Sequence, residues 1–265
     1  MNYTLSRDLG LVFWQIRYEQ RAFWRNRVRG FFTFAFPLMF LVIFASLDKG
    51  AHLYSGANRI SYDEFFVPGI LAYALISSTY VSMAIGTAIL RDEGILKRMQ
   101  GTPLPRWAYI AARIGSTALM VIAISAVTLT LGAAAYGVQV RGATIPGLVL
   151  ALVLGSAAFT TLGIGITRFI PNAEAAPVVV NVTILPLTFI SSVWFPTSAL
   201  PGWLRSIAHA FPIQPLANAL QYAFNPHTTG VGVNVTDLWV LAGWTSIGVW
   251  LMILFMRSPE GGRAG

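Results

Sequence analysis

Cysteine is absent from this 265-residue sequence, and lysine occurs only twice, at Lys49 and Lys97. The lack of cysteine excludes a disulfide framework, a thiolate metal site and a cysteine nucleophile. A phosphate-binding loop of the Walker type places a lysine after a glycine-rich turn, and neither lysine follows such a turn. The sequence therefore excludes ATP binding by that device.

Charged side chains are also scarce. They make up 11% of the chain, whereas hydrophobic residues make up 55%. Soluble domains carry roughly 25% charged residues, so we expect that water is not the main solvent of this protein. The formal charge of +8 does not indicate nucleic-acid binding, because the 18 basic residues are spread between long apolar runs and not clustered on one face. We expect membrane lipid, and no nucleic acid, around the chain.

The three histidines, His52, His209 and His227, all lie between the longest apolar runs. No two of them have the spacing of metal ligands. An intramembrane serine protease needs a histidine base at membrane depth, and no apolar run contains one. We therefore expect no metal site, no catalytic residue and no cofactor bound by this chain.

Six runs of the sequence contain no Asp, Glu, Lys or Arg. A helix needs about 20 apolar residues to cross roughly 30 Å of hydrocarbon, and a charge at its centre costs about 2.5–3.5 kcal/mol. The runs are Phe31–Leu47, Phe66–Leu90, Ile114–Val138, Ile145–Thr167, Pro177–Trp194 and Leu238–Met256. They predict an all-α polytopic membrane protein whose single domain, residues 31–256, has six transmembrane helices.

The basic residues predict the orientation of these spans. An even number of spans places both termini on one side, and 14 of the 18 basic residues then fall on the side of the termini. The four on the other side are Lys49, Arg59, Arg141 and Arg205. By the positive-inside rule, residues 1–30 and the tail 257–265 are cytoplasmic.

The first thirty residues form an amphipathic segment. Between Leu11 and Trp24, aromatic side chains alternate with charged ones, a mixture typical of a helix that lies in the headgroup layer. Such a helix would either only anchor the chain or also contact a partner protein, and the sequence leaves both open.

The segment Phe195–Phe224 is apolar but interrupted by four prolines, Pro196, Pro201, Pro212 and Pro215. Proline breaks a helix, and broken backbone is not tolerated in contact with lipid. We predict a re-entrant hairpin of two short helices in the outer leaflet between spans 5 and 6. Its hinge is expected at Phe211–Pro212, with Trp203 as an interfacial anchor.

Small and hydroxylated residues, such as Ser77, recur within the predicted spans. They favour close helix packing, and the alternative is that some of them line a substrate path. Asn181 is the strongest candidate for such a path, because lipid cannot satisfy its amide group.

The cytoplasmic run Arg91–Pro105 combines a short helix with charges of both signs. Ile95, Leu96 and Met99 share one face of this helix, and Gly101 with Pro103 ends it. An apolar anchor surrounded by charge is suited to a groove on another protein. A helix that lies on the membrane would have a similar pattern.

The run Arg91–Pro105 resembles the signature cytoplasmic loop of permeases of type-two ABC exporters. Leu185–Pro196, followed by Leu200–Leu204 and Phe211–Pro212, is similar to the fifth span and outer hairpin of that family. The fifth-span pattern is closest to the branch that exports drugs and lipid conjugates. Ser192 departs from the pattern, because glycine is expected there.

The resemblance implies a permease that pairs with a second permease, identical or homologous, and with two cytoplasmic ATPase subunits that hold ATP and Mg. It also implies a coupling helix that docks on the ATPase, formed by Arg91, Glu93, Gly94, Ile95, Leu96, Lys97 and Arg98. Some exporters of this superfamily line their tunnel with aromatic residues. The candidate path is therefore Tyr73, Ser77, Tyr80, Phe159, Asn181 and Phe189.

The expected function is ATP-driven export of an amphipathic or hydrophobic compound, a drug or a lipid-like molecule, across the cytoplasmic membrane. Two alternatives remain at this point. One is export of a lipid-linked polysaccharide by the same kind of permease. The other is a membrane enzyme or channel that works alone.

Overall fold

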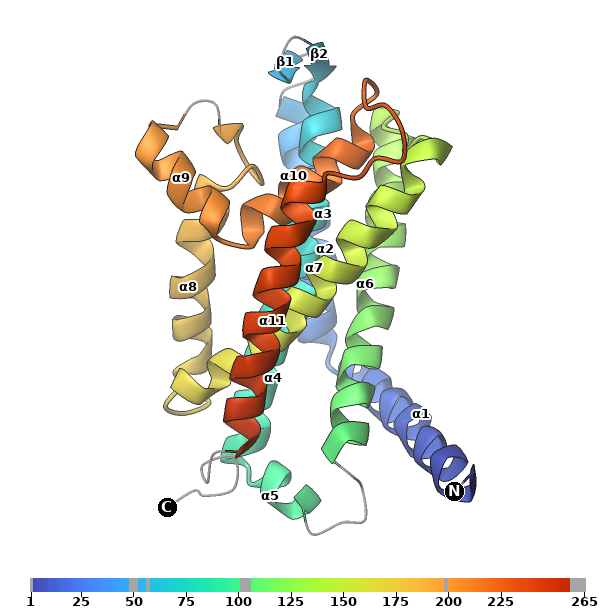
Figure 1. The fold of residues 1–265 in the computed structure, drawn as a ribbon, viewed down its shortest axis with the longest axis vertical. Coiled ribbons are helices and arrows are strands. Elements are labelled where there is room, and N and C mark those ends of the chain that lie inside the picture. The colour runs from blue at the N-terminus through green and yellow to red at the C-terminus, as the bar shows by residue number, and fades with distance from the viewer. Residues whose placement is uncertain (1, 48–51, 56–57, 101–105, 198–199, 258–265) are drawn as a thin grey trace.

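The computed structural model describes residues 2–47, 52–55, 58–100, 106–197 and 200–257, and the statements below concern these residues. Apart from one short hairpin their regular secondary structure is helical (Figure 1), including two 3-10 turns at Gly142–Thr144 and Thr167–Phe169. The elements are α1 (Asn2–Arg25), α2 (Arg27–Leu47), β1 (His52–Ser55), β2 (Asn58–Ser61), α3 (Tyr62–Ile76), a π-helical turn (Ser77–Val81), α4 (Ser82–Asp92), α5 (Ile95–Gln100), α6 (Arg106–Tyr136), α7 (Ile145–Ile166), α8 (Ala176–Ile190), α9 (Gly202–Ala210), α10 (Ile213–Phe224) and α11 (Val235–Arg257).

Four helical stretches are long and apolar enough to cross a membrane: Tyr62–Asp92, Ala108–Tyr136, Gly142–Phe169 and Val235–Met256. They correspond to the predicted spans 2, 3, 4 and 6. The helices at the predicted spans 1 and 5 have shorter apolar stretches, Thr33–Ile43 and Ala176–Ile190. The helical architecture with several apolar helices is therefore confirmed, and the count of six spans stays a prediction.

The hairpin β1–β2 is the part of the fold that the all-α prediction did not contain. Its antiparallel register pairs His52 with Ser61 and Ser55 with Asn58. The two strands are four residues each and fall in the short segment between the first two predicted spans. Strands of this length carry too little periodicity to stand out in a sequence.

The long helix Tyr62–Asp92 begins at a capping box. The Ser61 hydroxyl accepts a hydrogen bond from the Glu64 amide at 3.2 Å, and the Glu64 carboxylate accepts one from the Ser61 amide at 2.9 Å. This reciprocal pair satisfies two of the amides that a helix start leaves without partners. The helix therefore starts four residues before the predicted charge-free run.

A π-helical turn at Ser77–Val81 interrupts this helix near its middle. The hydroxyls of Ser78 and Thr79 both donate to the carbonyl of Leu75, at 3.0 and 2.7 Å. These bonds supply the backbone carbonyl of Leu75, just before the widened turn, with two side-chain donors. Single π turns inside α-helices are frequent at functional sites.

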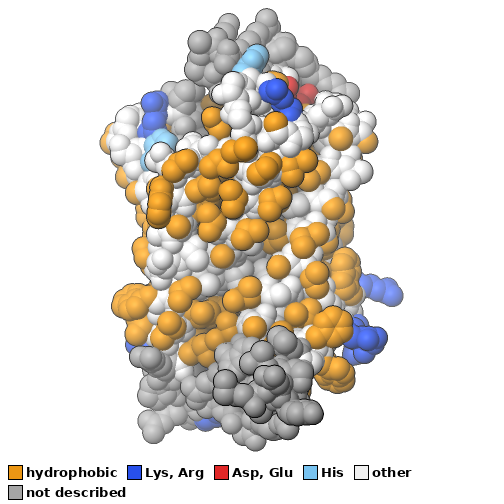
Figure 2. Space-filling view, turned by 45° about the vertical axis from the view of Figure 1, so that its right-hand side comes forward, with side chains coloured by type: hydrophobic (Ala, Val, Ile, Leu, Met, Phe, Trp, Pro, Cys, Tyr) orange, Lys and Arg blue, Asp and Glu red, His pale blue; other side chains and the backbone are white. Residues whose placement is uncertain are grey.

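Helix α3 forms the centre of the molecule. Phe66, Ile70 and Leu71 are completely buried, and α3 packs against α2, α6 and α10. The outer helices instead expose large apolar side chains, such as Ile122 on α6 and Trp250 on α11. Figure 2 shows hydrophobic side chains over the middle of one face, with Lys and Arg toward its two ends. This distribution is typical of a protein surrounded by lipid.

The two ends of the molecule carry different elements. The start of α1, the end of α11 and α5 lie at one end, whereas the hairpin β1–β2, α9 and the end of α10 lie at the other (Figure 1). We call them the α5 end and the hairpin end. The assignment of the α5 end to the cytoplasm stays a prediction. Residues 101–105 of the predicted cytoplasmic loop and residues 258–265 of the tail lie outside the described residues.

Helices α7 and α11 pack closely along their length because glycines lie at the contact. A Cβ atom on Gly165 would lie 2.6 Å from the Leu251 Cβ, and one on Gly248 would overlap the Thr161 hydroxyl. Small residues of this kind let membrane helices approach one another. Gly243, on the same helix as Gly248, has no atom within 4 Å of such a Cβ.

Replacement of Gly248 by leucine should therefore push α7 and α11 apart. We expect a loss of about 1–3 kcal/mol of stability, the usual cost of overpacking, seen as a lower melting temperature of the purified protein. Gly243→Leu is the matched control, because it gains the same helix propensity without the overlap. Equal melting temperatures for the two variants would contradict this account.

Candidate functional site

Helix α5 is set off from α4 by a glycine turn. Gly94 has φ +67°, a left-handed conformation that glycine adopts without strain. Glu93, Lys97 and Arg98 are exposed, whereas Ile95 and Leu96 are half-buried. Leu96 packs against the cluster of Met83, Ile164, Met252 and Phe255.

The sequence predicts that the apolar side chains of α5 are available to a partner protein. In the structure two of them instead contact the chain itself. Ile95 lines a cavity of the chain itself, and Leu96 contacts its other helices. The described side chains that α5 leaves exposed, Lys97 and Arg98, are charged. The side chain of Met99, the third predicted anchor, is outside the described part of the structure.

The end of α4 is bound to the segment that leads into α8. The Arg91 guanidinium donates to the carbonyls of Thr167 at 2.9 Å and of Pro171 at 3.1 Å. The Asp92 carboxylate accepts a hydrogen bond from the amide of Ala173 and forms an ion pair of 3.2 Å with Arg91. We call these five residues the α4–α8 clamp.

Helix α1 is joined to the bundle at the same end. The Gln20 side chain donates to the Ser116 carbonyl at 2.9 Å and lies 3.0 Å from its hydroxyl. The buried Arg113 of α6 donates to the Thr87 hydroxyl of α4 at 3.0 Å and lies 3.9 Å from the Glu19 carboxylate of α1. The amphipathic helix is therefore attached to α6 by polar contacts, and Arg113 connects α6 in turn to α4.

Helix α8 turns only one narrow stripe toward the protein. Ala176, Val180, Ile184 and Thr188 are buried at the four-residue spacing of one helix face. Val182 is 68% exposed and Phe189 58%, and Asn181 is exposed among them. The outward face of α8 is therefore apolar with a single amide.

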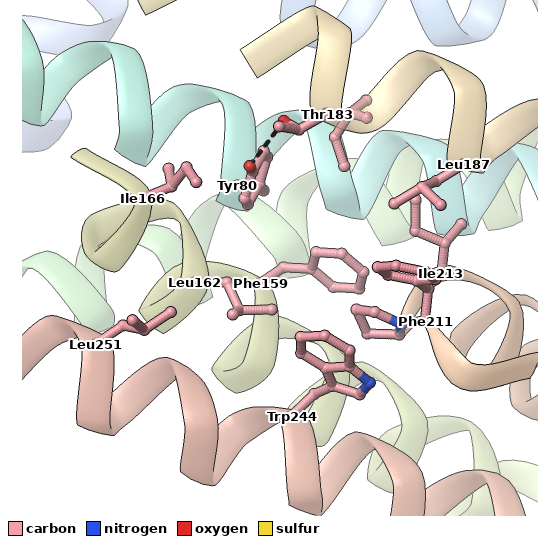
Figure 3. A pocket seen from close by; sticks show the side chains of 12 residues that line it. Tyr80, Phe159, Leu162, Ile166, Thr183, Leu187, Phe211, Ile213, Trp244 and Leu251 are labelled. Atoms are coloured by element: carbon pink, nitrogen blue, oxygen red, sulfur yellow. Dashed lines mark hydrogen bonds between the residues drawn. The ribbon is translucent and has the colours of Figure 1, made fainter. Parts of the chain in front are cut away.

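A cavity of about 220 Å³ lies behind α8, enclosed by α7, α10 and α11 and the π-helical turn (Figure 3). Phe159, Leu187 and Trp244 are among its apolar lining residues. Its polar groups are paired: the Tyr80 and Thr183 hydroxyls are 2.9 Å apart, and the Trp244 indole donates to the Ala210 carbonyl at 2.8 Å. The interior is therefore suited to an apolar guest.

The six residues of the predicted path fall in four places. Tyr80 and Phe159 line the cavity, whereas Asn181 and Phe189 lie on the outward face of α8. Ser77 is half-buried at the start of the π-helical turn. Tyr73 contacts the Trp194 ring, with centroids 5.2 Å apart.

Trp194 is a residue whose position the sequence did not reveal. Its ring has four aromatic neighbours, Phe40, Phe66, Tyr73 and Phe189, at centroid distances of 5.2 to 6.4 Å. These residues come from α2, α3 and α8. Trp194 is the last residue of the predicted fifth span. A tryptophan at the end of a span is the feature of the sequence that could have drawn attention to it.

The proline-rich segment after α8 folds into two short helices. Pro201 directly precedes α9, and Pro212 directly precedes α10, so the helix break falls at Phe211–Pro212. Pro196 is half-buried in the preceding turn, and Trp203 is 67% exposed. Gln221 of α10 binds this turn through a hydrogen bond to the Ser192 carbonyl at 2.6 Å.

A family model described as ABC-2 type transporter matches residues 11–225. The chain belongs to the ABC-2 type transporter family. The matched stretch extends from α1 to the end of α10, so it contains the clamp, α8 and the two short helices. The family confirms the expected resemblance, and it identifies the chain as the non-catalytic transmembrane permease of such a transporter.

Several curated proteins are similar to this ABC-2 permease. The daunorubicin resistance ABC transporter permease protein DrrB1 of Streptomyces coeruleorubidus is 25% identical over 188 residues, which cover 69% of this chain and 64% of that protein. The inner membrane transport permease YadH of Escherichia coli is 21% identical over 186 residues, 70% of this chain and 71% of YadH. The probable multidrug ABC transporter permease YbhR of Escherichia coli is 20% identical over 156 residues, 59% of this chain and 42% of YbhR.

Loss of the clamp carboxylate should loosen the segment before α8 in this ABC-2 permease. In Asp92→Ala we expect the amide of Ala173 to exchange hydrogen about tenfold faster, since a hydrogen bond to a charged group contributes about 1.5 kcal/mol or more. Hydrogen exchange with mass spectrometry measures this directly. Glu93→Ala, the exposed acidic neighbour, is the control, and a similar change in both variants would refute the clamp.

Proposed function

We propose that this ABC-2 permease is the membrane-spanning subunit of an ATP-driven exporter for an amphipathic or hydrophobic compound, a drug or a lipid-like molecule. The observation that carries the proposal is that α8 combines an apolar outward face, an apolar cavity behind it and a hydrogen bond from the segment before it to the end of α4, which leads into α5. Relatives named for daunorubicin resistance and multidrug transport support the class of cargo. The membrane is the cytoplasmic (inner) membrane, as in the name of YadH.

In this proposal ATP and Mg are bound by a separate cytoplasmic ATPase, present in two copies. The exposed charges Glu93, Lys97 and Arg98 form its docking surface, and Arg91, Gly94, Ile95 and Leu96 hold the coupling helix in place. Leu96 contributes by fixing α5 against α7 and α11. Helix α1 borders the same surface, because it lies at the same end (Figure 1).

The α4–α8 clamp gives this docking surface a mechanical connection to the path. A displacement of α5 acts on Glu93 and Asp92, and Asp92 holds the amide of Ala173 three residues before α8. Arg91 holds the end of α7 in the same way. Movement of the ATPase would therefore reach α8 without passing through the core around α3.

The path lies between two permeases, identical or homologous, that face each other across α8. Asn181 supports this arrangement, because an amide on the outward face of a membrane helix needs a partner that lipid does not provide. The chain would then have six spans with both termini in the cytoplasm. The helices α9 and α10 would re-enter the outer leaflet, where cargo leaves past Trp203.

The cavity in Figure 3 favours an apolar cargo over the alternative, a lipid-linked polysaccharide. Its hydroxyls and its indole already have partners within the protein, so no free donors are offered to sugar hydroxyls there. The family assignment speaks against the other alternative, an enzyme or channel that works alone.

Charge reversal on α5 tests the coupling surface. We expect Lys97→Glu combined with Arg98→Glu to weaken binding of the ATPase about tenfold or more, because like charges across an interface repel. Co-purification in mild detergent and ATP hydrolysis of the complex measure the effect. Arg205→Glu at the hairpin end should leave both unchanged, and ATPase binding that survives the double reversal would count against this surface.

The absence of cysteine allows a direct test of the permease pair. Val182→Cys places a single thiol on the outward face of α8, and in a pair of identical permeases we expect an oxidised dimer in membranes. Val153→Cys places a thiol on an exposed face of α7 and should remain monomeric. Equal cross-linking of the two variants would argue against α8 as the facing surface.

A further inference from the structure

A second cavity, of about 270 Å³, lies at the α5 end between α1, α4 and α6. It differs from the cavity behind α8 in having both apolar and charged lining residues. They include Tyr18 and Glu19 of α1, Met83 and Ile89 of α4, and Tyr109 and Arg113 of α6. Of the residues to which the export mechanism gives a role, only Ile95 of the coupling helix lines this space.

Two residues of opposite charge, Arg113 and Glu19, line this cavity. Arg113 is 7% exposed, and its guanidinium lies 3.9 Å from the Glu19 carboxylate, too far for a direct hydrogen bond. The Tyr109 ring lies 5.9 Å from the Arg113 guanidinium carbon. One cation and one anion therefore border the same space, with a phenol beside them.

The Tyr109 hydroxyl has an unmet requirement. Its oxygen is buried, and within the described part of the chain it has no hydrogen-bond partner. A buried hydroxyl without a partner is costly, and the great majority of such groups in proteins are satisfied. Tyr109 is one of the residues that line the cavity, so a ligand with an acceptor atom beside its hydroxyl would satisfy it.

The depth of the cavity indicates where such a ligand comes from. Arg113 directly precedes the predicted span 3, which starts at Ile114, and α1 is the helix expected in the headgroup layer. Tyr18 and Ile89 are exposed at the edge of the cavity, whereas Met83 is buried within it. Polar groups at headgroup depth beside apolar ones match the two parts of a phospholipid, and basic pockets between membrane helices bind lipid headgroups.

We propose that this cavity binds one zwitterionic phospholipid of the phosphatidylethanolamine class. Its phosphate accepts hydrogen bonds from Tyr109 and Arg113, its ammonium group faces Glu19, and part of an acyl chain lies against Met83 and Ile89. The pair of opposite charges selects this headgroup, because an anionic lipid would bring its net charge close to Glu19. Free phosphate would leave the apolar lining unfilled.

The bound lipid would fill the space between α1 and the bundle. It would therefore fix the position of α1 beside the docking surface while remaining separate from the cargo path. The proposal can be tested independently of the export function, because its polar contacts, Tyr109, Arg113 and Glu19, have no role in the proposed cargo path.

Native mass spectrometry of the full-length permease in mild detergent tests this site. The probes are phosphatidylethanolamine, phosphatidylglycerol of the same acyl chains, and inorganic phosphate. We expect phosphatidylethanolamine to be retained about tenfold better than phosphatidylglycerol, and Tyr109→Phe to weaken its retention about tenfold, the effect of one hydrogen bond to a charged group. Glu19→Gln should reduce the preference between the two lipids.

Tyr222→Phe, which removes a hydroxyl at the hairpin end, is the matched control and should bind lipid as the wild type does. The melting temperature of each variant shows whether it is folded, and Tyr109→Phe keeps the ring packing. Undiminished retention by Tyr109→Phe would overturn the proposal. Equal retention of the two lipids by the wild type, or displacement of lipid by inorganic phosphate, would overturn it as well.

Discussion

A carbonyl that leaves a helix within an apolar layer must find its donor in the protein, because lipid offers none. The proposed re-entry of α9 and α10 into the outer leaflet would place the hairpin end under this constraint. Where α8 stops, the Ser192 carbonyl accepts from Gln221, and the Thr197 and Leu200 carbonyls accept from Arg205. Where α9 stops, the Ala210 carbonyl accepts from Trp244. Side chains of α9, α10 and α11 therefore hold the broken backbone.

The same rule connects the two ends of the molecule. At the α5 end, Arg91 satisfies carbonyls at the end of α7 and beyond, and Asp92 satisfies an amide just before α8. Helix α8 is therefore held by polar contacts before its first turn and after its last one. Between them it contributes only a narrow buried stripe, so its position depends on the contacts at its ends.

Much of the helical architecture could be predicted from the sequence, because a charge inside hydrocarbon is so costly that charge-free runs mark the apolar helices. The helix break at Phe211–Pro212 could also be predicted, because proline acts locally. The hairpin β1–β2 could not, because four-residue strands have no usable period. The packing of Leu96 against its own chain could not be predicted for a related reason. The apolar face of a six-residue helix has the same sequence pattern whether it contacts a partner protein or the rest of its own chain.

The candidate site was less accessible to prediction. The pairing of Tyr80 with Thr183 joins residues 103 positions apart, and the clamp joins residues 81 positions apart. No local pattern specifies such contacts, which follow from the way that the helices pack. The sequence drew attention to Asn181 as a polar residue within a span, and the structure adds that it is exposed on the outward face of α8. Its place in a substrate path stays a prediction.

The π-helical turn at Ser77–Val81 has a consequence for how the chain can vary in length. It holds one residue more than an α-helical turn, and each residue of an α-helix advances the side chains by about 100°. Deletion of a single residue there would turn it into an α-helical turn and leave the helix below it in about the same orientation. Deletion of a residue elsewhere in the helix would rotate everything below it by that angle. In that second case Arg91 and Asp92 would point away from their partners beside α7 and α8. The π-helical turn is therefore the place where this helix can lose one residue without moving the clamp.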